Sequence, residues 1–326
     1  MKKSTIALGI LTAVAATGYI VYQTAFSTQA VVVDAQAQQT KFSQYANAER
    51  FINAQELKAM MDSKADVVVI GALNPMKPDS PISGSHTLWR NDYSASEGAY
   101  PFGGMRNSTA EMEKILSDFG ATPESTIVVY AAGAHHDASR LFWQIQNLGH
   151  QDVRYLDGGL NAWIGANLPT GDANQSVTAT SYKAPAAQNE TNTLATLQMV
   201  LAAQNNNDWV IIDTRSTDEF TGATAVSGAF GPGTIPGSVH IEWTKALNAD
   251  TTLKSAAELQ ALYGDTIKGK KVIAYCQSGV RSAHTYMVLT DVLGAKDVYN
   301  YDGSWIEYSY AHYEKKDPAV NVVNGK

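Results

Sequence analysis

A chain of 326 residues is long enough for two domains of ordinary size, each with its own hydrophobic core. Its formal net charge of −7, with no stripe or cluster of basic residues, argues against a nucleic-acid partner. With 44% apolar and 17% charged residues, the composition is that of a folded globular protein and not of a disordered one.

The first forty residues have the pattern of an export signal. Lys2 and Lys3 precede a stretch over residues 6–22 that is apolar or small almost throughout, and Ala35-Gln36-Ala37 has the spacing of a signal-peptide cleavage site. Because the apolar stretch also reaches the lower limit for a membrane span, a retained anchor is the alternative. We therefore expect residues 1–37 to be a signal peptide or an N-terminal anchor. The rest of the chain is then periplasmic, with membrane contact only if this segment is retained.

Between residues 49 and 170, short apolar runs alternate with helical segments. The pairs Asn53–Glu56 and Ser108–Glu111 have the spacing of a capping box, which predicts the start of a helix. The remaining pattern predicts strands over 67–70, 126–130 and 153–156, and helices over about 53–63, 108–120 and 141–148. We expect this stretch to form one domain.

The alternation pauses and then starts again. Residues 171–192 are rich in Ala, Thr, Ser, Gln and Asn with little apolar patterning, which predicts an interdomain linker. Residues 193–326 then predict strands over 209–212 and 272–275, helices over 194–203 and 283–293, a turn over 233–238 and a capping box at Ser255–Glu258. Such alternation predicts an α/β fold of two tandem domains, each a mostly parallel sheet with helices on both faces.

The two halves are copies of one another. A constant shift of 145 positions, without gaps, lays residues 126–163 on residues 271–308 and pairs Tyr130 with Tyr275. The same shift pairs Leu148-Gly149 with Leu293-Gly294 and Asp157-Gly158 with Asp302-Gly303. It places Ala131 opposite Cys276, so only the second copy keeps a nucleophile at this position.

Cys276 is the only cysteine of the chain and stands between a predicted strand and a predicted helix. Backbone N–H groups of such a loop can point inward, with the positive end of the helix dipole behind them, and both features favour a thiolate. Arg281 can reach back over the loop and adds to this effect. The alternative is an inert buried thiol, because free cysteines are often buried. The loop context favours the reactive thiol. Because the chain has one cysteine, this thiol cannot be consumed by an internal disulfide.

Four motifs of the second half resemble those of the two-domain rhodanese-type sulfurtransferases, the thiosulfate/3-mercaptopyruvate sulfurtransferase family. In chain order they are Asp213-Thr214-Arg215 with Glu219-Phe220, Gly233-Thr234-Ile235-Pro236-Gly237-Ser238-Val239-His240, Cys276-Gln277-Ser278-Gly279-Val280-Arg281-Ser282 and Tyr301-Asp302-Gly303-Ser304-Trp305. The resemblance extends from about residue 49 to the C-terminus and is weaker in the first half, where Gly71 replaces the aspartate of the D-x-R motif. It implies an inactive rhodanese-like domain over 49–170 and a catalytic one over 193–326, with no cofactor and no metal.

The resemblance implies that the reaction takes place at the loop that starts with Cys276. Cys276 is its implied catalytic nucleophile, and the implied substrate-binding residues are Gln277, Ser278, Gly279, Val280, Arg281 and Ser282. Relatives that act on phosphate or arsenate esters carry one residue more in this loop, which argues against a phosphatase or an arsenate reductase. The resemblance therefore implies an enzyme, a thiosulfate sulfurtransferase (rhodanese). It would move a sulfane sulfur from thiosulfate, a small anion, through a Cys276 persulfide to cyanide or a thiol.

Other functions stay open at this point. Family members that use 3-mercaptopyruvate carry an arginine near the position of Glu219, and an acidic residue there would repel the carboxylate of that donor. Glu219 thus favours thiosulfate, unless it is only a solvated surface charge. Arg281 either attracts the dianionic donor or braces the loop. A persulfide carrier and a non-catalytic binding module are the remaining alternatives.

The other polar residues that attract notice have structural interpretations. We expect Asp213 and Arg215 to form an ion pair at the end of a strand. His135 and His136 have no acidic or cysteine partner nearby in the sequence, so they make a weak metal site. His284 is expected to be a partly exposed helix residue, because sulfane transfer needs no general acid.

Overall fold

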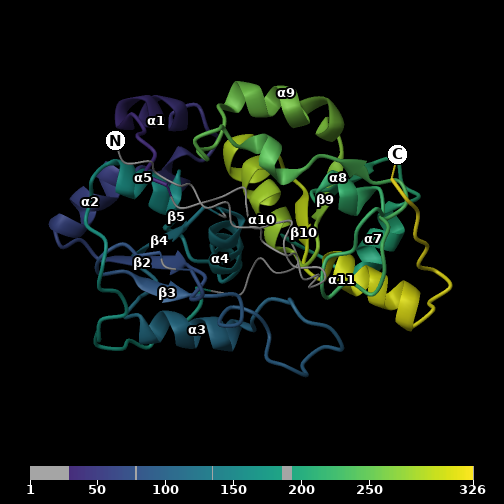
Figure 1. Cartoon of the computed structure of the whole chain (residues 1–326), viewed down its shortest axis with the longest axis horizontal. Coiled ribbons are helices and arrows are strands. Elements are labelled where there is room, and N and C mark those ends of the chain that lie inside the picture. Colours follow the sequence, from purple (N-terminus) through teal and green to yellow (C-terminus); the bar gives the residue numbers. More distant parts are fainter. Residues whose placement is uncertain (1–28, 78, 134, 186–192, 326) are drawn as a thin grey trace, which may run out of the picture.

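The computed structural model describes residues 29–77, 79–133, 135–185 and 193–325, and these form two α/β units, each built on a five-stranded parallel sheet (Figure 1). The first sheet has the order β1-β5-β4-β2-β3. Its strands are β1 (Phe51–Ile52), β2 (Val67–Ala72), β3 (His86–Leu88), β4 (Thr126–Ala131) and β5 (Val153–Leu156). All described pairings between them are parallel.

The second sheet repeats this order as β6-β10-β9-β7-β8. Its strands are β6 (Leu194–Ala195), β7 (Trp209–Asp213), β8 (Val239–His240), β9 (Lys271–Tyr275) and β10 (Val298–Tyr301). The central strands β4 and β9 are apolar runs that are buried along almost their whole length, as expected for a parallel sheet covered on both faces. The repeated order confirms two parallel-sheet units with helices.

The helices of the first unit are α1 (Ala35–Phe42), α2 (Ala54–Asp62), α3 (Thr109–Asp118), α4 (His135–Asn147), α5 (Gly159–Gly165) and the 3₁₀ turn η1 (Ala48–Arg50). Those of the second are α7 (Leu197–Ala203), α8 (Thr217–Phe220), α9 (Ala256–Ile267), α10 (Val280–Met287), α11 (Ser304–Ser309), the 3₁₀ turn η2 (Trp243–Ala246) and the π-helices η3 (Val288–Val292) and η4 (Tyr310–Glu314). The capping boxes predicted at α2, α3 and α9 are all present.

The largest differences from the sequence-based expectation concern three elements. Residues 194–195 are the short strand β6, because Leu194 and Ala195 pair with β10, and this pairing overrides their helix propensity. The helix α4 begins at His135 and not near residue 141, since its polar first turns are buried by neighbouring elements instead of facing solvent. The helix after the Cys loop starts at Val280 and ends in the π-helix η3.

The helices α4 and α10 pack against each other between the two sheets, at the centre of the molecule (Figure 1). Both are buried over almost their whole length. One hydrophobic cluster extends across this contact and includes Trp143 of α4 and Met287 of α10. The two units therefore share a core, which brings side chains of the first unit within reach of the loop that precedes α10.

Two further expectations, the export segment and the interdomain linker, concern the two ends of the first unit. Most of the predicted export segment, residues 1–28, lies outside the described residues, and Ala35-Gln36-Ala37 forms the first turn of α1. Among the described helices, none has both the length and the apolar character that crossing a membrane requires. The described part of the expected linker, residues 171–185, has neither helix nor strand and runs along α3, with Tyr182 buried and its N–H bonded to Ser117.

Candidate active site

Cys276 follows directly on β9, and the loop from Cys276 to Gly279 connects this strand to α10. Gly279 is the N-cap of α10 with φ 72° and ψ 1°, a left-handed conformation that favours glycine. A Cβ atom on Gly279 would lie 2.8 Å from both Arg140 Nη1 and the carbonyl oxygen of Asp302, so the turn also has no room for a side chain. The tight turn places Cys276 behind the N-terminus of a helix, with 1% of its surface exposed.

Side chains at the end of β10 hold this loop. Ser304 Oγ accepts hydrogen bonds from the N–H groups of Cys276 (3.1 Å) and Gly279 (2.9 Å) and donates to the carbonyl of Tyr301 (2.6 Å). Asn300 Nδ2 donates to the carbonyl of Gly279 (3.0 Å). The role of Ser304 was not predicted, although the duplication contains a hint, because the equivalent residue in the first unit is Gly159.

The surroundings of the sulfur favour a thiolate. Burial raises the pKa of the Cys276 thiol, but the Arg281 guanidinium, backbone and side-chain hydrogen bonds from Ser282 and a backbone hydrogen bond from Ser278 outweigh it and hold the pKa below its usual value. Ser282 Oγ lies 3.6 Å from Cys276 Sγ and 2.6 Å from Asn300 Oδ1. Because a hydroxyl carries one proton, Ser282 can donate it to the sulfur or to Asn300, but not to both at once.

The predicted binding residues do not all face the sulfur. Ser278 and Ser282 donate to it, and Arg281 acts on it through its charge. Gln277 lies away from it, with long contacts from Nε2 to the carbonyls of Val226 (3.4 Å) and Ser227 (3.5 Å). The turn residue Gly279 and the buried first helical residue Val280 complete the loop backbone.

Arg281 is engaged by a buried carboxylate. Its Nη1 and Nη2 atoms lie 2.7 and 2.9 Å from the two carboxylate oxygens of Glu219, which is only 1% exposed. Burial raises the pKa of Glu219, but hydrogen bonds and charge from Arg281 outweigh burial and lower it to about 2. The interpretation of Glu219 as a solvated surface charge is therefore wrong. The two opposite charges offset each other at the rim of the site, so Glu219 no longer argues strongly against a carboxylate donor.

The neighbouring motif residues are structural, as expected. Arg215 pairs with Asp213 at 2.6 Å, and Tyr275 donates its hydroxyl proton to the same carboxylate at 2.6 Å. The Arg215 guanidinium lies 4.7 Å from the centre of the Trp305 ring. This network joins the ends of β7 and β9 beneath the Cys loop and contacts no part of the sulfur.

A loop of the first unit covers the site. Residues 95–105, which we call the cover loop, line a half-open pocket of about 230 Å³. At Gly104 the loop lies so close to the Cys loop that a Cβ there would come 2.8 Å from the Cβ of Ser278. The first unit thus supplies one wall of the approach to Cys276.

Three histidines lie where α4 meets α10, two of them buried and His136 with 13% of its side chain exposed. Trp243 lies between His136 and His284, with ring centroids 4.6 and 5.2 Å away, and His135 is fully buried. No hydrogen-bond partner contacts either ring nitrogen of His135 or of His284. The expectation that His284 is partly exposed is therefore wrong, because α10 faces the first unit. In the described part of the chain, no group of three or more His, Cys, Asp or Glu side chains is arranged to hold a metal ion.

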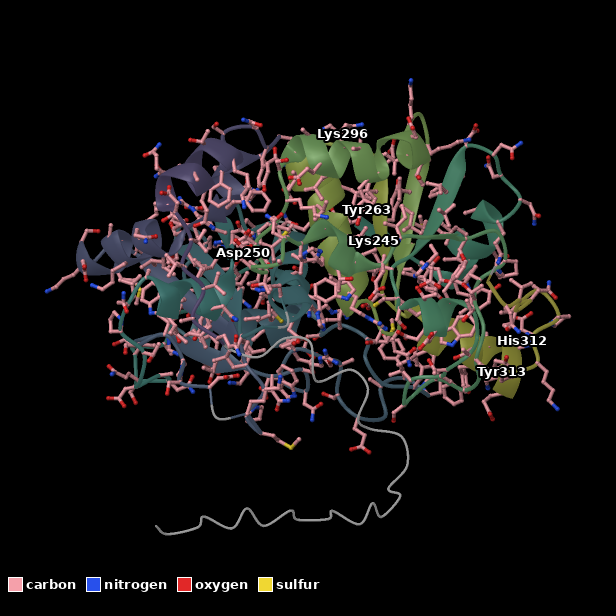
Figure 2. All side chains as sticks on the ribbon, turned by 45° about the horizontal axis from the view of Figure 1, so that its top comes forward. Lys245, Asp250, Tyr263, Lys296, His312 and Tyr313 are labelled. Atoms are coloured by element: carbon pink, nitrogen blue, oxygen red, sulfur yellow. The ribbon has the colours of Figure 1, made fainter. Side chains whose placement is uncertain are left out.

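These histidines have lowered pKa values. Burial lowers the pKa of His135 to about 4 and those of His136 and His284 to about 3, and the attraction of Asp157 and Asp250 to His135 offsets burial only in part. Asp250 lies where the second unit borders the first (Figure 2). All three rings are therefore neutral in the folded protein at pH 7.

We expect the free energy of unfolding to fall when the pH is lowered from 7 to 5.5. A histidine with a lowered folded-state pKa stabilises the fold above its unfolded pKa of about 6.5, and this contribution is lost as the pH falls below it. For three such groups the loss reaches roughly 4 kcal/mol over this window. Urea unfolding at the two pH values measures it. His284→Phe removes one titrating ring and should make the dependence shallower, whereas equal stability at both pH values would contradict the assignment.

Comparisons with known proteins agree with this architecture. A family model described as the Rhodanese-like domain matches residues 53–166 and, again, residues 196–311. The chain is 38% identical over 206 residues to "Putative thiosulfate sulfurtransferase 1" of Mycobacterium bovis, covering 61% of this chain and 73% of the relative. It is 27% identical over 275 residues to a thiosulfate sulfurtransferase of Corynebacterium glutamicum, covering 82% and 90%, and 33% identical over 212 residues to the sulfur carrier protein TtuD of Thermus thermophilus, covering 62% and 74%.

Solved structures share the fold. An anaerobic ergothioneine biosynthesis enzyme from Chlorobium limicola, solved with trimethyl histidine, superposes with a TM-score of 0.74 at 21% identity, covering 86% of this chain and 72% of the other. The structure of YnjE superposes with a TM-score of 0.72 at 24% identity, covering 86% and 70%. At these identities the likeness concerns the fold alone.

Proposed function

Because this chain belongs to the family of rhodanese-like domains and is a sulfurtransferase of that family, we propose that it takes a sulfane sulfur from thiosulfate onto Cys276 and passes it to cyanide or a thiol. One observation carries the proposal. Cys276 Sγ is held at the N-terminus of α10 with the Ser278 and Ser282 N–H groups directed at it, and its pKa is lowered. This arrangement suits a sulfur that must attack as a thiolate and then carry a second, anionic sulfur.

Two displacements complete the proposed reaction. The Cys276 thiolate attacks the outer sulfur of thiosulfate, the S–S bond of the donor breaks, and sulfite leaves with the bonding electron pair. The acceptor then attacks the outer sulfur of the persulfide, releasing thiocyanate or a new persulfide and returning the Cys276 thiolate. The loop N–H groups are fixed before the reaction and stabilise the negative charge at each stage. Ping-pong kinetics follow from this order.

The donor is best tested directly. The relatives named for thiosulfate support thiosulfate, whereas the Arg281–Glu219 pair leaves a carboxylate donor such as 3-mercaptopyruvate as the alternative. Thiocyanate formation is measured with each donor, for wild type and for Cys276→Ser. Turnover of thiosulfate with a persulfide on wild-type Cys276 supports the proposal. Preference for mercaptopyruvate overturns the donor, and the lack of turnover and persulfide with both donors overturns the enzyme.

A sulfur carrier is the second candidate. It is favoured by the relative named as a sulfur carrier protein. Persulfide-loaded protein is mixed with cyanide or with a protein thiol, and the release of the outer sulfur is timed. Fast release only to the protein thiol identifies the carrier.

Changes at the two ends of the Arg281–Glu219 pair should move the Cys276 pKa in opposite directions. Arg281→Met removes the charge that lowers this pKa, so the thiol is expected to titrate at a higher pH. Glu219→Gln leaves the guanidinium uncompensated, so the thiol should titrate lower and thiosulfate should bind more tightly. The rate of alkylation by iodoacetamide as a function of pH reports the Cys276 pKa of each variant. Shifts of the same sign would contradict the charge argument.

We also propose export, with residues 1–37 as the signal. Two side chains that attach α1 to the body of the protein lie after the proposed cleavage site: Gln38 and Lys41 both contact Asp157. Removal of residues up to Ala37 would therefore leave these contacts intact. N-terminal sequencing of the protein from a periplasmic fraction tests the site, and an intact N-terminus in the membrane fraction would identify the anchor instead.

A further inference from the structure

Arg140 is a residue of the first unit whose charged end lies in the second. It stands on α4, is 1% exposed, and its guanidinium lies 4.9 Å from the centre of the Trp143 ring. Its Nη2 atom forms an ion pair with Asp302 Oδ1 at 2.5 Å, and its Nη1 atom donates to the carbonyl of Gly279 at 3.3 Å. Both partners border the Cys276 sulfur site, although α4 belongs to the unit that has no nucleophile.

The contact with Gly279 fixes the turn of the Cys loop. The Gly279 N–H is held by Ser304, and its carbonyl accepts from both Asn300 and Arg140. Ser278 and Ser282, whose N–H groups are directed at the sulfur, lie on either side of this turn. Because the Gly279 backbone is anchored at both its N–H and its carbonyl, the turn cannot rotate without breaking these bonds. Arg140 therefore restrains the backbone that presents donors to Cys276.

The same guanidinium ties the cover loop to the site. Arg140 Nη2 also donates to the carbonyl of Gly104 at 3.2 Å, and the second carboxylate oxygen of Asp302 accepts from the N–H of Arg106 at 3.1 Å. Arg140 and Asp302 together thus connect the cover loop of the first unit to the Cys loop of the second. Gly104 lies against Ser278 at this point.

The duplication shows that this link is asymmetric. Asp157, the equivalent of Asp302, binds Lys41 at 2.7 Å, next to the loop that has Ala131 instead of a cysteine. The position in α10 equivalent to Arg140 is Thr285, so the second copy has no arginine at this position. A buried ion pair is often no more stabilising than apolar side chains of the same size. The arginine is therefore found only where it can act on the Cys loop.

We propose that Arg140 is a positioning residue for the sulfur transfer at Cys276, through which the first unit sets the conformation of the Cys loop and holds the cover loop over it. This inference rests on the proposed function for its effect on turnover. Its effect on the Cys276 thiol is independent of any donor. The first unit is then a working part of the site and not only a scaffold.

The test separates positioning from stability. Arg140→Met leaves the buried Asp302 carboxylate with the Arg106 N–H but without a cationic partner and should lower the urea midpoint, whereas Arg140→Met/Asp302→Asn removes both charges and should recover most of it. We expect the double variant to keep a kcat for thiosulfate:cyanide transfer about 10²-fold below wild type. We also expect its iodoacetamide alkylation to follow a higher pKa for Cys276, because the loop N–H groups are no longer held on the sulfur.

The equivalent pair in the first unit is the control. Lys41→Met/Asp157→Asn removes the ion pair at the equivalent aspartate of the first unit and should leave the kcat and the alkylation profile of Cys276 unchanged. A double variant at Arg140 and Asp302 with wild-type kcat and wild-type alkylation would show that the pair is only structural and overturn the proposal. If the wild type transfers no sulfur from thiosulfate, the proposed function fails, while the alkylation profiles still decide the role of Arg140.

Discussion

Cys276→Ser should abolish sulfur transfer while leaving the fold intact. A serine hydroxyl is close in size to a thiol, and the loop around it is held by backbone groups and by Ser304, none of which depends on the sulfur. The hydroxyl cannot accept a sulfane sulfur, and its proton leaves far less readily than that of a thiol whose pKa is already lowered. Loss of a covalent nucleophile lowers kcat by on the order of 10⁴-fold or more.

Three measurements define the result. Thiocyanate formation gives kcat, the intact mass after incubation with thiosulfate shows whether a sulfur atom has been added, and the urea midpoint reports the fold. Since Cys276 is the only cysteine of the chain, wild-type mass should increase by one cyanide-labile sulfur and that of the variant should not. A variant that still transfers sulfur with a wild-type urea midpoint would remove Cys276 from the reaction.

Local patterns predicted the parts of the fold that are determined locally. The capping boxes at Asn53, Ser108 and Ser255 depend on residues three positions apart, and all three are present. The buried strand β5 was predicted with its bounds, because the run Val153–Leu156 ends directly before Asp157-Gly158. The parallel sheets followed from the alternation of strands and helices.

What sequence patterns could not predict depends on contacts between distant segments. The short strand β6 exists because β10 lies beside it, and His284 is buried because α4 covers it. The pairing of Arg281 with Glu219 joins residues 62 positions apart, and neither residue alone indicates it. Arg140 is the extreme case, because it stands in the copy without a nucleophile and its partners lie in the other copy.

The duplication was the most informative sequence feature for the site, and the structure extends it. Each unit surrounds the loop after its fourth strand with groups from outside that loop: Lys41 and Gln38 reach Asp157 in the first unit, and Arg140 reaches Asp302 in the second. The equivalent aspartates thus each bind a basic side chain from another element. The two copies differ at the residue that holds the loop, because Gly159 stands in the first copy where the second has Ser304. A Cβ atom on Gly159 would lie 3.0 Å from the imidazole of His135. The first copy has therefore lost the thiol and the hydroxyl that holds the loop N–H groups.

Gly279→Ala should inactivate the site through the backbone. An alanine at φ 72° is strained by about 1 kcal/mol, and its Cβ would also lie 2.8 Å from Arg140 Nη1 and from the Asp302 carbonyl. Neither neighbour can yield easily, since both are buried and Arg140 is held by an ion pair. The turn must shift, which moves the Ser278 and Ser282 N–H groups away from the sulfur. We expect kcat to fall by about 10²-fold or more.

The matched control for this change is Gly269→Ala, in the turn that precedes β9. Gly269 has φ 70°, almost the same strain, but no atom lies within 4 Å of the position its Cβ would take. It should therefore lose about 1 kcal/mol of stability and keep its kcat. If both variants lose similar stability and both retain wild-type kcat and persulfide formation, the geometry of the Gly279 turn does not matter to the chemistry. A selective loss at Gly279 would show instead that the donors of the Cys loop must be fixed before the sulfur arrives, because strain alone is the same in the two variants.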